Sequence, residues 1–155
     1  MKTNCRGAII LGMHDAIVSL TGLIAGLFFA FTDANIIIIT CIISSITAAL
    51  SMGAANYLAV KTQNRKTALK SAFYTGGAYI ITCILLILPF FIFTYRTSTI
   101  VSVILMAIFI IFTFNRCCYH KQQFYKHFFE MLAICTIVSI TAFFIGEIAS
   151  QIFGV

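Results

Sequence analysis

Asp15 stands inside an otherwise uncharged apolar stretch, and its carboxylate is the first group in this sequence that could do chemistry. A carboxylate within a membrane span costs about 2.5–3.5 kcal/mol on insertion scales, so its presence there indicates a function. It lies seven residues into the stretch that begins at Ala8, roughly 10 Å from that end of a helix. An ionised Asp15 would attract a cation and a protonated one would release it. The alternative is an Asp15 at the membrane interface, with the span starting at Ala16.

Met52 and Asn56 lie at a matching depth in the second apolar stretch. Met52 is eight residues before Val60, about 12 Å from the end of a helix. Asn56 follows one turn later, on the same helical face. A carboxylate, a thioether and an amide could therefore converge. Ferrous and manganous ions accept carboxylate and amide oxygen, and a thioether favours the softer iron over magnesium or calcium.

Three weaker candidates accompany this set. His14 is next to Asp15, and imidazole binds iron and titrates near neutral pH. The alternative for His14 is a polar side chain that faces the lipid headgroups. Glu130 lies near the start of the last apolar stretch, where an acidic group also suits a helix N-terminus. Glu147 lies toward the other end of that stretch and could form an exit site.

The composition requires a membrane to position these residues. Of 155 residues, 61% are apolar and 9% are charged, and the mean hydropathy is +1.06. A soluble domain is about 45–50% apolar and about 25% charged. So small a core could not bury the excess, which excludes a soluble enzyme, a disordered chain and a nucleic-acid binder. The length predicts a single transmembrane domain over residues 1–155.

The windows without charge predict five transmembrane helices and an all-α fold. A helix needs about 20 apolar residues to cross the hydrocarbon layer, and the long uniform runs do not alternate as barrel strands do. We place the spans near residues 8–31, 36–60, 72–94, 97–115 and 128–152.

Basic residues predict the orientation of these spans. With the N-terminus in the cytosol and the C-terminus outside, nine of the ten Lys and Arg residues are cytosolic and only Arg96 is external. This bias follows the positive-inside rule. The net charge of +6 is then mostly a signal of topology, and no nucleic-acid partner is expected.

Two segments resemble the vacuolar iron transporter family. Gly12–Ser19, with the sequence GMHDAIVS, is similar to that family's G-x-N-D-G-L-V-S opening. Ser51–Gln63, with the sequence SMGAANYLAVKTQ, resembles its S-M-x-x-G-E-Y-L-S-V-x-S-Q signature. By position, Asp15 matches the aspartate of the first motif and Met52 the methionine of the second.

The resemblance implies a function, a partner and a substrate. It implies export of ferrous or manganous ion from the cytosol in exchange for protons, by a homodimer with the metal path at its interface. The metal is the transported substrate, and no cofactor and no enzymatic reaction are expected. The choice between iron and manganese stays open. The short chain, without a targeting extension, favours a bacterial inner membrane over a vacuolar one.

The sequence departs from the family at the site itself. Asn56 stands where the signature has a glutamate, and His14 where the opening has asparagine. The family's Glu-rich cytosolic insert is also absent, since only residues 61–71 join the second and third spans. An amide can ligate a cation but carries no charge and takes no proton. The alternative function is therefore a non-transporting membrane partner that kept the fold and lost the metal site.

Overall fold

Long apolar helices account for nearly all of the part of the chain that can be described. The computed structural model describes residues 5–31, 33–92, 101–102, 104–110 and 121–153. Its long helices are α1 (Cys5–Ala30), α2 (Ala34–Lys61), α3 (Arg65–Ile92) and α5 (Lys121–Phe153). Residues 101–102 and 104–110 are helical too.

Four helices in the described residues are long and apolar enough to cross a membrane. These candidate spans are Arg6–Phe28, Asn35–Lys61, Arg65–Ile92 and Phe129–Ile152. They confirm the prediction of an all-α membrane protein. Much of the predicted fourth span, 97–115, lies outside the described residues, so a total of five spans stays a prediction.

Two helices begin earlier than the predicted spans. α3 begins at Arg65 rather than near residue 72, and α5 begins at Lys121 rather than near residue 128. The predicted boundaries followed the loss of apolar residues, but Lys and Arg are good helix formers. The helices therefore continue through the charged residues, past the apolar stretch that a membrane would cover.

Polar side chains fix the starts of α2 and α3. Asp33 is the N-cap of α2, and its carboxylate accepts a hydrogen bond of 2.9 Å from the backbone N–H of Asn35. Asn64 precedes α3, and its side-chain oxygen accepts from the backbone N–H of Lys66 at 3.1 Å. Both bonds satisfy backbone donors that a helix start leaves unpaired. The short turn makes α2 and α3 a tight antiparallel hairpin.

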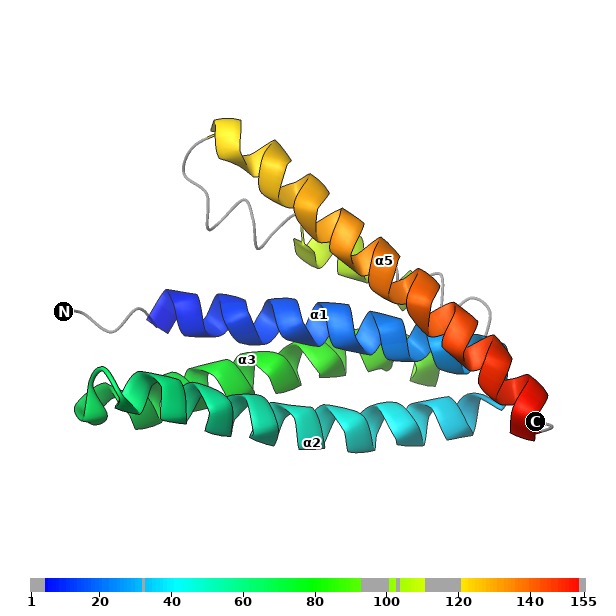
Figure 1. Ribbon diagram of the computed structural model, residues 1–155, viewed down its shortest axis with the longest axis horizontal. Coiled ribbons are helices and arrows are strands. Elements are labelled where there is room, and N and C mark those ends of the chain that lie inside the picture. The colour runs from blue at the N-terminus through cyan, green and yellow to red at the C-terminus, as the bar shows by residue number, and fades with distance from the viewer. Residues whose placement is uncertain (1–4, 32, 93–100, 103, 111–120, 154–155) are drawn as a thin grey trace.

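Figure 1 shows α1, α2 and α3 running roughly alongside one another, with α5 crossing α1 at an angle. α3 packs against both α1 and α2, and α1 packs against α5. α1 begins at the end of the molecule where α2 turns into α3, and α5 ends at the opposite end (Figure 1). This arrangement suits the predicted orientation, which stays a prediction.

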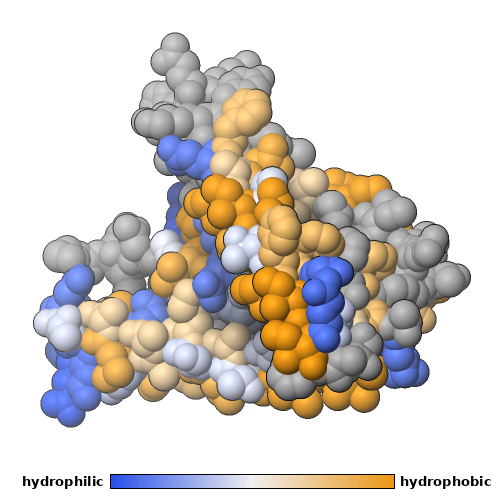
Figure 2. Space-filling model, turned by 45° about the vertical axis from the view of Figure 1, so that its right-hand side comes forward, coloured by the Kyte–Doolittle hydropathy of each residue, from blue (hydrophilic) through white to orange (hydrophobic). Residues whose placement is uncertain are grey.

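The buried core lies where α1, α2 and α3 meet. Its most enclosed side chains include Ile17, Ile37, Cys41 and Cys83. Many large apolar side chains are exposed, and Figure 2 shows many hydrophobic residues on the face in view. Such a surface is costly in water and suits a lipid environment.

Gly22 and Gly26 of α1, which are four residues apart, lie against α5. A Cβ atom built on Gly22 would lie 2.7 Å from Cγ1 of Val138. One built on Gly146 would lie 2.5 Å from the carbonyl oxygen of Gly26. Small residues at these positions let the two backbones approach closely, as in other membrane helix pairs.

Candidate ion site

A row of buried polar side chains on α3 forms the centre of the candidate site. Ser71, Thr75 and Tyr79 follow one another at intervals of four residues, which places them on one helical face. All three are buried, and Thr75 is fully enclosed. We call these three residues the α3 polar row. Buried hydroxyl groups in a membrane helix need hydrogen-bond partners, and α1 and α2 supply them.

Asp15 of α1 lies next to the Tyr79 end of the α3 polar row. The hydroxyl of Ser19 donates to the Asp15 carbonyl oxygen at 2.6 Å. The oxygen of Ser19 is also 2.7 Å from the Tyr79 hydroxyl. Because Ser19 has a single proton to give, Tyr79 is the donor in the second bond.

Asn56 of α2 lies next to the other end of the α3 polar row. Its side-chain nitrogen donates to the Ser71 carbonyl at 3.2 Å, to the Ser71 hydroxyl at 2.9 Å and to the Thr75 hydroxyl. Thr75 in turn donates to the Ser71 carbonyl at 3.0 Å. The amide of Asn56 is therefore held as a donor, a role that an ionised carboxylate cannot take.

The structure thus brings two predicted residues, Asp15 and Asn56, to neighbouring turns of one α3 face. Met52 is half-buried one turn before Asn56 and packs against the hydrophobic core. His14 is half-buried beside Asp15, with its Nε2 atom enclosed. The carboxylate of Asp15, by contrast, belongs to an exposed residue on the outer surface of α1.

Close approach of α1 to α3 makes this arrangement possible. A Cβ atom built on Gly12 would run into the backbone carbonyl of Thr75. Glycine at this position lets α1 pass directly over the α3 polar row, one turn before Asp15. The prediction from sequence treated Gly12 only as part of a motif, and the structure gives the physical reason for it.

The two glutamates of α5 stand apart from this arrangement. Glu130 and Glu147 are both exposed. The Glu147 carboxylate accepts a hydrogen bond of 3.2 Å from Gln151 on the same helix. Within the described residues, no group of three or more His, Cys, Asp and Glu side chains could hold a metal ion. Met52, Asn56 or a second subunit would have to complete a site at Asp15.

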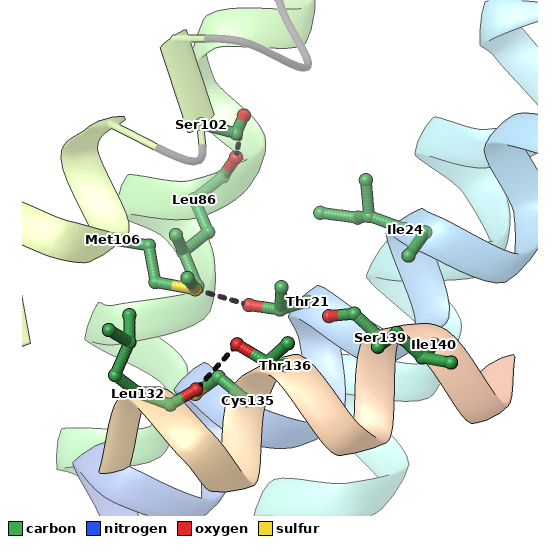
Figure 3. A pocket seen from close by; sticks show the side chains of 11 residues that line it. Thr21, Ile24, Leu86, Ser102, Met106, Leu132, Cys135, Thr136, Ser139 and Ile140 are labelled. Atoms are coloured by element: carbon green, nitrogen blue, oxygen red, sulfur yellow. Dashed lines mark hydrogen bonds between the residues drawn. The ribbon is translucent and has the colours of Figure 1, made fainter. Parts of the chain in front are cut away.

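A separate cavity of about 370 Å³ is lined by residues of α1, α3 and α5 and by Ser102 and Met106 (Figure 3). There the Thr21 hydroxyl, which donates to the Ile17 carbonyl of its own helix at 2.6 Å, lies against the Met106 sulfur, and Ser102 donates to the Leu86 carbonyl at 3.0 Å. None of the predicted site residues lines this cavity, so it is distinct from the α3 polar row.

Ser19, Thr75 and Tyr79 were not among the residues predicted from sequence. A signal for two of them exists, because Ser71, Thr75 and Tyr79 recur every fourth residue in the third apolar stretch. Such a spacing predicts one polar face on a membrane helix. Ser19 has no comparable signal, since its role depends on which helix packs beside it.

A comparison with known proteins finds a match in the part of the chain that contains Asp15, Met52 and Asn56. A family model described as the VIT family matches residues 6–68. Over residues 6–68 the chain is similar to proteins of the VIT family. The matched part contains α1, α2 and the first turn of α3, and therefore Asp15, Met52 and Asn56. The match supports the predicted family and, with it, metal-ion transport across a membrane in general. No curated protein matches the chain.

VIT family proteins are transporters rather than enzymes, in agreement with the predicted absence of enzymatic activity. The family match does not extend over α5. The roles of Glu130 and Glu147 therefore rest on sequence position alone.

Proposed function

We propose that this protein exports divalent iron or manganese from the cytosol in exchange for protons, with Asp15 as the group that carries both. The main support for this proposal is the position of the Asp15 carboxylate within a candidate membrane span. Asp15 and Asp33 are the only acidic residues within the VIT family match. Asp33 caps α2 at a helix end, which leaves Asp15 as the carboxylate within a span.

The surroundings of Asp15 suit alternate binding of a cation and a proton. Ionised Asp15 attracts a divalent cation, and protonation removes that attraction, so the two ligands exclude each other. Met52 would add a thioether that favours the softer iron. Because the nitrogen of Asn56 is bonded to α3, its carbonyl oxygen is the atom that could turn toward a metal.

The exposure of Asp15 supports a homodimer as the transporting unit. An exposed carboxylate on a membrane helix is costly when it faces lipid. A second copy that packed over this face of α1 would shield Asp15 and could add its own ligands. His14 would lie at the edge of such an interface.

The free energy needed to export a divalent cation favours metal–proton exchange over passive flow of the metal. Moving a divalent cation out of a negative interior costs about 2 × 2.3 kcal/mol per 100 mV, so a passive channel would import it. The sequence has no G-x-x-x-x-G-K-[ST] loop for ATP. An inward proton gradient is the remaining source of free energy, and a titratable Asp15 would couple it to the metal.

Growth of a strain that lacks its own metal exporter tests this proposal. In toxic iron or manganese, the wild-type protein should restore growth and Asp15→Asn should not. Asp33→Asn is the matched control, because it makes the same chemical change while asparagine still caps α2. Immunoblots of the membrane fraction must show equal amounts. Growth restored equally by Asp15→Asn would contradict the assigned role of Asp15.

A non-transporting partner is the second candidate, and the hydrogen bonds of Asn56 favour it. They fix an amide where the family signature has a glutamate, so a charged ligand is replaced by a structural donor. This candidate predicts no rescue by the wild-type protein in either metal, although the protein is present and folded. Rescue by the wild type would exclude it.

A further inference from the structure

An open groove runs between α2 and α3 and differs from both the candidate ion site and the cavity of Figure 3. Its volume is about 470 Å³. Its floor consists of small residues of the two helices, among them Gly53 and Gly76, and its walls include the exposed side chains of Leu50 and Phe73. We call it the α2–α3 groove. Its size is within the range of about 300–1,000 Å³ that is usual for small-molecule sites.

The α2–α3 groove points toward a cluster of positive charge. Lys61 lies one turn beyond Tyr57, which lines the groove, and its ammonium nitrogen is 5.3 Å from the centre of the Tyr57 ring. On α3, Lys66 precedes the lining residues Leu69 and Phe73 by three and seven positions. This spacing places it near the same helical face. Both walls of the groove therefore end in an exposed lysine.

No acidic residue of the neighbouring sequence neutralises this cluster. Arg65 and Lys70 add two further positive charges, and the chain has no Asp or Glu between Asp33 and Glu130. A basic cluster directly beside a membrane span attracts anionic lipid, at about 1 kcal/mol per Lys or Arg. An apolar groove that leads to it offers room for the acyl chain of the same molecule.

We propose that the α2–α3 groove binds an anionic phospholipid, with an acyl chain between α2 and α3 and its phosphate at Lys61 and Lys66. Complementarity of charge favours a lipid over a second copy of this chain, whose own basic cluster would repel it. The site does not depend on metal transport, because it shares no residue with Asp15 or the α3 polar row.

Native mass spectrometry of the detergent-purified full chain tests this proposal. Phosphatidylglycerol and phosphatidylcholine with identical acyl chains are added in equal amounts. The wild type should retain phosphatidylglycerol preferentially. The double variant Lys61→Gln, Lys66→Gln should bind it roughly 30-fold more weakly, because two contributions of about 1 kcal/mol are lost. Arg6→Gln, at the exposed start of α1, removes a charge outside the groove and should have little effect.

Filling the α2–α3 groove tests the acyl-chain half of the proposal. Gly77 lines the groove, and a Cβ atom built on it meets nothing within 4 Å, so Gly77→Leu should fill part of the groove. This variant should lose the lipid while its melting temperature in detergent is kept, and Gly77→Ala should have a smaller effect. Equal retention of both lipids by the wild type, or undiminished binding by Gly77→Leu, would overturn the proposal. Conversion of a dimer to a monomer by Gly77→Leu would also overturn it, because a second copy would then occupy the groove.

Discussion

Asn56 shows how one substitution within a family motif can change the role of a residue. Its amide donates to a carbonyl and two hydroxyl groups of α3. A glutamate at this position would face the Ser71 carbonyl with a negative charge and no donor. Where the family signature has a glutamate, this chain has an amide that ties α2 to α3.

Asn56→Glu should therefore destabilise the protein rather than restore a site. The substitution removes the amide's hydrogen bonds to Ser71 and Thr75 and brings a negative charge up to the Ser71 carbonyl oxygen, which costs about 1–3 kcal/mol. A lower melting temperature of Asn56→Glu in detergent, measured by light scattering or intrinsic fluorescence, would show this loss of stability. Asn35→Glu is the control, because it puts the same charge at an exposed position in the first turn of α2, where it is favourable. Equal melting temperatures of the wild type and Asn56→Glu would contradict this view of Asn56.

The hydrogen bond between Ser19 and Tyr79 should couple α1 to α3 energetically. We expect a coupling free energy of about 0.6 kcal/mol, and up to about 1.7, in a double-mutant cycle of Ser19→Ala and Tyr79→Phe. Unfolding in mixed micelles with increasing SDS would measure it. Thr47→Ala offers a reference in place of Ser19→Ala, because the exposed Thr47 hydroxyl bonds only to Ile43 of its own helix. A cycle of Thr47→Ala with Tyr79→Phe should give no coupling.

At the scale of elements, alanine substitutions at Gly12 and at Gly77 should have opposite effects on the stability of the protein. Gly12→Ala should destabilise the protein by about 1–3 kcal/mol, because the new Cβ would displace α1 from the Thr75 carbonyl. Gly77→Ala should be neutral or stabilising by about 0.5–1 kcal/mol, since alanine favours a helix and space is available. SDS unfolding of both variants under one condition would check the difference. Equal effects would mean that α1 and α3 are not in close contact at Gly12.

The helices were largely predictable from the sequence, while their contacts were not. Uncharged apolar windows located α1 and α2 closely, because the membrane imposes both length and composition on a span. The start of α3 lies before the predicted span, because lysine and arginine end an apolar window without ending a helix. The depth of Asp15 also followed from counting residues. Its partners Ser19 and Tyr79 did not, because they depend on how α1 lies across α3.

At the scale of the whole molecule, the orientation in the membrane is directly testable. The account places the α2–α3 turn in the cytosol and the start of α2 outside. A membrane-impermeant maleimide added to intact cells should therefore label Asn35→Cys but spare Gln63→Cys, and both positions are exposed. The wild type, with its own cysteines, provides the background. Labelling of Gln63→Cys from outside would reverse the orientation and with it the direction of transport.

Transport by purified protein in liposomes tests the central claim most directly. Ferrous or manganous ion is added outside, with a metal-sensing dye inside and with or without an acidic lumen. The account predicts uptake that requires the acidic lumen, is abolished in Asp15→Asn and persists in Asp33→Asn. A lack of uptake of both metals by folded, dimeric wild-type protein would contradict it, and so would uptake that ignores the proton gradient.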